Sequence, residues 1–189
     1  MGHKKIVRKF RFTFAFLVLV CCLRVSAQES CFEINNDPLF NKMEGAWIGK
    51  GTRIYLASKN KVEIQIEVET QKNRANGIFS KNNIEEFIIE DNQRKTLKSY
   101  LYSYWIKCKE RGHYVLGKGD SFKEEKSNSK GIFQNDVFNT TEYIGGDATK
   151  VLGETRFIST DHVEFSQKFY FDNKLQSITE IKFYKEKDL

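Results

Sequence analysis

Residues 62–69 read Val62-Glu63-Ile64-Gln65-Ile66-Glu67-Val68-Glu69, in which branched apolar residues alternate strictly with polar ones. Successive side chains of a β-strand point to opposite faces, so this period of two puts all the apolar residues on one face. The stretch therefore predicts a strand with one face in an apolar interior and the other in water, as is typical of antiparallel sheets.

Shorter stretches of the same character recur along the rest of the chain. Strands are predicted at residues 78–80, 84–90, 97–107, 114–118, 132–140, 151–159, 163–171 and 175–184. Turn-forming residues separate them, and Asp172-Asn173 predicts a tight hairpin. The charged, serine-rich residues 121–130 are predicted to form a solvated loop. Many short strands without a long helical pattern predict an all-β domain, either a sandwich or a barrel.

A short helix is predicted just before the first strand, over residues 37–43. Asp37 can cap it, Pro38 suits its first turn, and Gly45 ends it. The sequential hairpins that follow favour a closed meander, because closure removes the exposed edges of a sheet. We therefore predict a single antiparallel up-and-down β-barrel of 8–10 strands with a short N-terminal helix.

The first strand of this barrel carries an unusual set of glycines around one tryptophan. Gly45 and Gly49 would let the strand bend sharply, and Trp47 would plug one end of the barrel. We predict a structural role for these three residues.

Gly45-Ala46-Trp47 after a short helix resembles the opening of the calycin group, the lipocalins and their relatives. This resemblance implies a lipocalin-like barrel in which a basic residue of the last strand, Lys182 or Lys185, stands against the tryptophan. The longer Gly45-x-Trp47-x-Gly49-x-Gly51 is also similar to the start of nitrobindin-type and fatty-acid-binding-type barrels. The nitrobindin resemblance implies haem held by a late histidine. His162 is the only one, and since nothing else around it matches, we expect no cofactor.

The first 27 residues have the character of a cleaved signal peptide. A basic head precedes an apolar run over residues 12–23, and Val25-Ser26-Ala27 supplies the small residues that a signal peptidase requires. The run is shorter than the roughly 20 residues of a membrane-spanning helix. A lipid anchor at Cys21 or Cys22 is the minor alternative, because neither cysteine follows a suitable small residue.

The domain organisation follows from this leader. We predict a signal peptide over 1–27, an N-terminal extension over 28–36 and a calycin-like barrel domain over 37–189. The leader holds six basic residues and no acid, so its removal takes the net charge from +6 to zero. Without a net positive field we expect no nucleic-acid partner and no stable membrane insertion. The protein is predicted to be exported, either periplasmic or secreted.

Cys31 and Cys108 are the cysteines that remain after cleavage. An even pair in an oxidising compartment can form a disulfide. Closing the loop between them would stabilise the fold by about 4.5 kcal/mol on the chain-entropy model. Two free thiols are the alternative, and the sequence leaves both open.

Candidate ligand-binding residues follow from the alternation. They are the apolar faces of two predicted strands, three tyrosines that share a face, and one arginine that could hold a carboxylate: Val62, Ile64, Ile66, Val68, Phe165, Phe169, Tyr100, Tyr102, Tyr104 and Arg156. The tyrosines could instead form a ladder on the outer surface. The expected partner is a small apolar or amphipathic molecule, and the oligomeric state is left open.

Catalytic and metal-binding motifs are not found. His113 and His162 have no cluster of ligands at metal-binding spacing, and alternation places His162 and Glu164 on the solvent side. The main hypothesis is therefore an exported lipocalin-like binding protein. A filled barrel with a structural or protein-interaction role is the alternative. An enzyme that uses Glu154, Arg156 or His162 is a distant third.

Overall fold

The computed structural model describes residues 30–73, 77–119, 129–144 and 148–186. The predicted signal peptide and its cleavage site lie outside these ranges, as does nearly all of the predicted loop over 121–130. The described elements are α2 (Pro38–Met43), β1 (Gly45–Tyr55), β2 (Lys61–Asn73), β3 (Gly77–Glu90), β4 (Gln93–Glu110), β5 (His113–Lys118), β6 (Ser129–Gln134), β7 (Val137–Ile144), β8 (Thr149–Phe157), β9 (His162–Phe171) and β10 (Lys174–Lys185).

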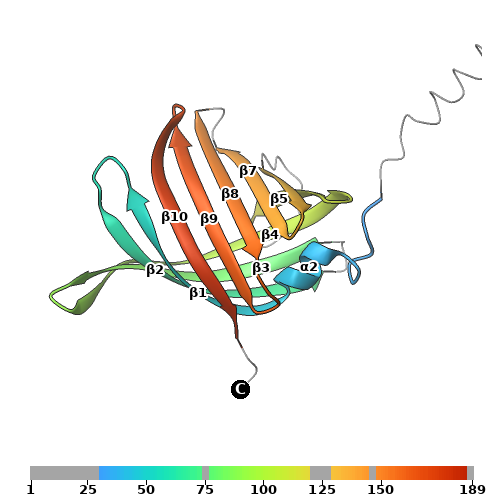
Figure 1. Ribbon diagram of the computed structural model, residues 1–189, viewed down its shortest axis with the longest axis horizontal. Coiled ribbons are helices and arrows are strands. Elements are labelled where there is room, and N and C mark those ends of the chain that lie inside the picture. The colour runs from blue at the N-terminus through green and yellow to red at the C-terminus, as the bar shows by residue number, and fades with distance from the viewer. Residues whose placement is uncertain (1–29, 74–76, 120–128, 145–147, 187–189) are drawn as a thin grey trace, which may run out of the picture. The chain divides into compact units, whose positions relative to one another are not determined.

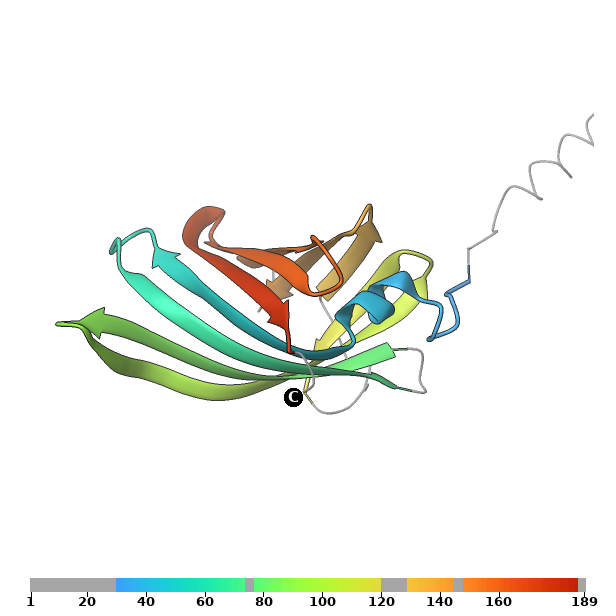
Figure 2. The same ribbon diagram turned by 60° about the horizontal axis from the view of Figure 1, so that its bottom comes forward.

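The strands form one closed antiparallel barrel (Figure 1). Each strand pairs with the next along the chain, and β1 closes the barrel by pairing with β10, from Trp47 opposite Lys185 to Tyr55 opposite Ser177. The predicted all-β class, the up-and-down topology and the short N-terminal helix are confirmed, and the described residues form ten strands. Figure 2 shows the long strands β2, β3 and β4 as one wall, with β8, β9 and β10 facing them.

Three of the hairpins are built on Asn and Asp residues that accept left-handed backbone angles. Asp172 and Asn173 have φ of 46° and 58°, and Asp91 and Asn92 have φ of 50° and 60°. Two consecutive residues of this kind give tight turns whose twist matches that of the flanking strands. The tight hairpin predicted at Asp172-Asn173 is confirmed.

Two strand predictions are corrected. Residues 132–140 do not form one strand, because Asn135 and Asp136, with φ of 51° and 61°, make a third turn that separates β6 from β7. Residues 78–80 and 84–90 belong to one strand, β3, since the polar residues between them keep the alternation and pair with β2 and β4.

The helix α2 closes one end of the barrel, opposite the β9–β10 hairpin (Figure 1). The Asp37 carboxylate accepts hydrogen bonds from the backbone N–H of Leu39 at 3.0 Å and of Phe40 at 3.2 Å, so the predicted cap is present. Leu39 and Phe40 are fully buried in the core at this end, together with Trp47. The helix therefore acts as a stopper.

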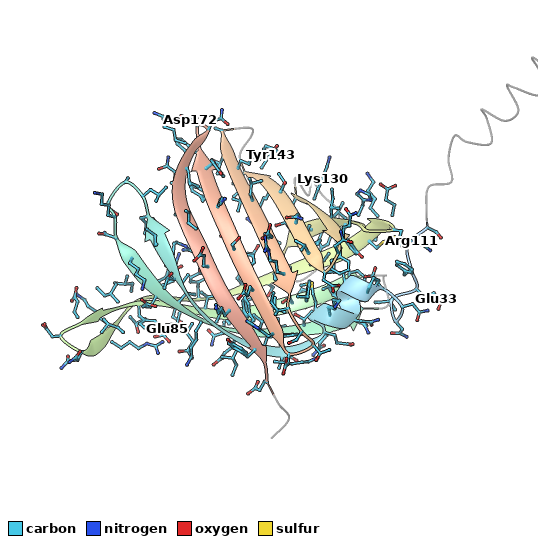
Figure 3. The ribbon with its side chains drawn as sticks, viewed as in Figure 1. Glu33, Glu85, Arg111, Lys130, Tyr143 and Asp172 are labelled. Carbon is cyan, nitrogen blue, oxygen red and sulfur yellow. A yellow bond between two sulfur atoms is a disulfide. The ribbon has the colours of Figure 1, made fainter. Side chains whose placement is uncertain are left out.

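The opposite end of the barrel carries the β1–β2, β3–β4 and β9–β10 hairpins and the paired ends of β7 and β8. In Figure 3, Tyr143 of β7 and Asp172 of the β9–β10 turn lie together at this end, while Glu33 and Arg111 lie at the end that α2 closes. We call the hairpin end the mouth of the barrel.

Candidate ligand-binding cavity

The barrel is hollow. An open cavity of about 500 Å³ lies between α2 and the mouth, lined by the inner faces of the strands. Its lining is Met43, Trp47, Arg53, Ile64, Ile66, Val68, Thr70, Asn82, Ile84, Tyr100, Tyr102, Tyr104, Ile106, Leu116, Gly117, Lys118, Ser129, Phe138, Thr140, Glu142, Ile144, Val151, Thr155, Phe157, Val163, Phe165, Gln167, Phe169, Thr179, Ile181 and Phe183.

One side of the cavity is apolar, and it comes largely from β2, β9 and β10. The alternation of residues 62–69 points Ile64, Ile66 and Val68 into the cavity. Phe165 and Phe169 join them from β9. Val62 shares their parity and is buried, but it is not among the lining residues.

The predicted tyrosine face lies on the inside of β4. Tyr100, Tyr102 and Tyr104 all line the cavity, which decides between the two alternatives that the sequence left open. Burial raises the pKa of Tyr102, and the Glu142 carboxylate and the two neighbouring tyrosines raise it further. Its hydroxyl therefore stays protonated and can donate a hydrogen bond into the cavity.

An arginine reaches the cavity from β1, near the mouth. Arg53 donates through Nη1 to Glu86 Oε1 at 2.7 Å and through Nε to Thr179 Oγ1 at 3.0 Å. The Tyr100 hydroxyl donates to the same Glu86 oxygen at 3.1 Å. Burial acts to lower the pKa of Arg53. A hydrogen bond with Tyr55 and the negative charge of Glu86 outweigh this effect, so the pKa of Arg53 is raised overall. We call Arg53, Glu86, Tyr100 and Thr179 the mouth cluster.

A second ion pair stands on the cavity wall where β5 and β7 approach β6. Lys118 Nζ lies 2.7 Å from Glu142 Oε1, and Glu142 is the more buried of the two, with 26% of its side chain exposed against 53%. Both side chains line the cavity.

The prediction that Arg156 faces inward is wrong. Arg156 lies on the outer face of β8, exposed, with its Nε 2.6 Å from Glu154 Oε1. Val151, Thr155 and Phe157 are the inward residues of β8, so position 156 must point outward. The arginine inside the barrel is Arg53, which shares the parity of Trp47 in β1, and that parity was the signal available in the sequence.

Trp47 stands at the floor of the cavity. Only 5% of its surface is exposed, its Nε1 donates to the Met43 carbonyl at 3.1 Å, and the ring lines the cavity from below. Lys185 of β10 lies over the indole, 5.4 Å from its centroid, so Lys185 rather than Lys182 takes the position that the calycin resemblance implied. Lys182 instead pairs with Glu164 at 3.5 Å.

His162 lies on the outer side of β9. Its ring stacks on Tyr184 with centroids 4.8 Å apart, and it is not among the cavity-lining residues. Glu164 lies beside it on the same face, with Nε2 and Oε1 separated by 3.9 Å. Across the described ranges, no group of three or more His, Cys, Asp or Glu residues could hold a metal ion.

Cys31 and Cys108 are joined in a disulfide, with their Cα atoms 6.0 Å apart. The bond ties the segment before α2 to β4. Cys108 belongs to the core cluster beneath the cavity, and Cys31 packs against that cluster. The bond therefore holds the stopper end of the barrel together.

Close packing of β1 against its neighbours narrows this part of the barrel. A Cβ at Gly49 would lie 2.5 Å from Phe183 Cε1 and 2.6 Å from Ile66 Cγ2. A Cβ at Gly51 would collide with the Glu180 carbonyl oxygen and lie 2.6 Å from Ile181 Cα. Gly45 has a φ of 116°, which side chains rarely adopt, at the point where the chain leaves α2 for β1.

Within the part of the chain that the structure describes, no helix has the length and apolar character needed to cross a membrane. The chain matches no family model and no curated protein.

Solved structures do share the fold. The S-type phycobiliprotein lyase CPES from Guillardia theta aligns over 80% of this chain and 92% of its own, with a TM-score of 0.59 and 9% identity. A protein of unknown function from the DUF3598 family of Nostoc punctiforme aligns over 84% of this chain, with a TM-score of 0.54 and 12% identity. This chain covers 51% of that second protein. At these identities the two likenesses show a shared fold alone.

Proposed function

We propose that this protein is an exported, lipocalin-like barrel that binds a small hydrophobic or amphipathic molecule in its central cavity. The observation that carries the proposal is the cavity of about 500 Å³, which falls in the size range of ligand sites in proteins. Its lining combines an apolar wall with a few polar side chains, the composition expected of such a site.

The cavity favours binding over the alternative of a filled barrel. Small barrels often pack their interior with their own side chains. Here the large aromatic residues Trp47, Phe138 and Phe157 gather at the end that α2 closes, and the space above them stays open. A structural module would gain nothing from this volume, since unfilled space in a core is destabilising.

Export is supported by two features that are independent of the cavity. Residues 1–27 have the sequence of a cleaved signal peptide. The disulfide between Cys31 and Cys108 belongs to proteins of oxidising compartments such as the periplasm or the extracellular space.

The cavity can be tested with N-phenyl-1-naphthylamine, an uncharged apolar probe that fluoresces when it leaves water. We expect saturable binding by the protein. Ile66→Trp places an indole in the cavity and should weaken probe binding about tenfold or more. Glu67→Trp is the matched control, because Glu67 is exposed on the outer face of the same strand, and it should leave probe binding unchanged.

Circular dichroism and thermal unfolding would show whether each variant is folded. Thr155→Phe fills the cavity from β8 and serves as a second variant. A probe that does not bind, or that binds equally well to both cavity-filled variants, would contradict the proposed function.

A further inference from the structure

The charges around the cavity are balanced. The charged side chains among the described lining residues are Arg53, Lys118 and Glu142. Arg53 is paired with Glu86 at 2.7 Å, and Lys118 is paired with Glu142 at the same distance. Each of these two cations thus already has a carboxylate in contact. With Glu86 counted, the described side chains around the cavity have no net charge to offer to a ligand.

The mouth cluster is especially well satisfied. Glu86 has 9% of its side chain exposed and Arg53 has 22%, so water screens their attraction weakly. Arg53 also donates to Thr179, and Glu86 also accepts from Tyr100. A ligand carboxylate placed beside Arg53 would meet the repulsion of Glu86. It would also lose its own hydration, which is costly without a free counter-charge.

Neutral polar side chains of the lining have hydrogen-bonding capacity to spare. Among the described residues, the side chains of Tyr102, Thr155 and Gln167 make no hydrogen bond to the protein while facing the cavity. They come from β4, β8 and β9, and Ile64, Ile66 and Ile181 stand on the apolar wall formed by β2 and β10. Such a lining suits a molecule with an apolar body and uncharged polar groups.

We infer that the cavity selects uncharged amphipathic molecules, such as long-chain alcohols, amides or esters, over carboxylates and amines of the same length. This inference rests on the proposed function, and it names the class of ligand. The selectivity comes from Glu86 and Glu142, which neutralise the two cations that would otherwise attract an anion.

The test is displacement of N-phenyl-1-naphthylamine by dodecanol, dodecanamide, dodecanoate and dodecylammonium, at a mildly alkaline pH where the carboxylate is ionised. The two uncharged compounds should displace the probe at concentrations about tenfold lower than the two ions. In Glu86→Gln, Arg53 loses its counter-charge, so dodecanoate should bind about tenfold more tightly while dodecanol is unchanged.

Glu85→Gln is the matched control, because Glu85 lies on the outer side of β3 with Arg94 and does not line the cavity. It should leave the selectivity of the wild type unaltered. Glu142→Gln frees Lys118 in the same sense and serves as the second variant if Glu86→Gln does not fold.

The outcomes separate the two proposals. Failure of the wild type to bind the probe would overturn the proposed function. If the probe binds and dodecanoate displaces it as well as dodecanol does, the selectivity alone is overturned. The selectivity is also overturned if neither Glu86→Gln nor Glu142→Gln strengthens dodecanoate binding.

Discussion

Asp37 joins α2 to the core at the stopper end of the barrel. It is fully buried, caps α2 and accepts hydrogen bonds from the Tyr114 hydroxyl, at 2.9 Å to Oδ1 and 3.0 Å to Oδ2. Burial raises the pKa of this carboxyl, although hydrogen bonds from Phe40, Tyr114 and Leu39 act in the opposite direction. The folded protein therefore holds the Asp37 proton more tightly than the unfolded chain does.

This shift predicts a pH dependence of stability. An acid whose pKa is raised on folding contributes most below its unfolded pKa, here about 3.8, and the contribution is lost as pH rises through the raised value. Asp37→Asn keeps an oxygen for the cap and for Tyr114 but does not titrate. The free energy of unfolding of Asp37→Asn, minus that of the wild type, should therefore increase as pH rises from about 3.8 and then level off.

Urea unfolding at a series of pH values measures this difference, and one that stays constant or falls would contradict the assignment. Asp37→Ala is the comparison that removes both functions of the side chain. It loses the cap and leaves the buried Tyr114 hydroxyl without its partner, so it should cost about 2–4 kcal/mol.

At the scale of elements, the closure of the barrel depends on how closely β1 approaches β10. Gly49 and Gly51 both leave no room for a Cβ, but the atoms that fill the space differ. At Gly49 they belong to the side chains of Phe183 and Ile66, which can shift, whereas at Gly51 they belong to the backbone of Glu180 and Ile181.

Gly51→Ala is therefore expected to destabilise the protein more than Gly49→Ala. Overpacking against side chains typically costs about 1–3 kcal/mol, and displacement of the partner strand should exceed that range. Chemical denaturation of both variants gives the comparison. An equal or smaller loss for Gly51→Ala would show that β1 and β10 are not held together as closely as described.

Much of the element structure could be predicted from the sequence. The alternation in residues 62–69 appears as β2 with its apolar face inward, and the Asp37 cap and the Trp47 floor followed from their local patterns. Asn135-Asp136 has the composition of a hairpin turn, but the apolar residues on either side of it suggested one continuous strand.

The candidate site was harder to predict, for a physical reason. In β8 apolar residues occur on both faces, with Val151 and Phe157 facing the cavity and Leu152 facing away from it. The alternation therefore does not decide which face is the inner one, and Arg156 was placed on the wrong one. The pairing of Arg53 with Glu86 joins β1 to β3 across β2. Such a contact depends on the register of three strands, which no local pattern encodes.

The molecule as a whole is a barrel with a closed floor, an apolar wall and a neutral polar wall around the cavity. Its isoleucines report on both sides of the barrel wall. Ile64, Ile66 and Ile181 point into the cavity, whereas Ile132 and Ile158 are exposed to solvent, with 49% and 55% of their surface accessible.

Methyl NMR spectra of the isoleucine-labelled protein, recorded as dodecanol is added, show whether a ligand enters the cavity. Binding in the cavity predicts saturable shifts of the Ile64, Ile66 and Ile181 methyl signals, complete at about one equivalent of ligand, with those of Ile132 and Ile158 unmoved. Shifts confined to Ile132 and Ile158, or no saturable shift at any isoleucine, would contradict it.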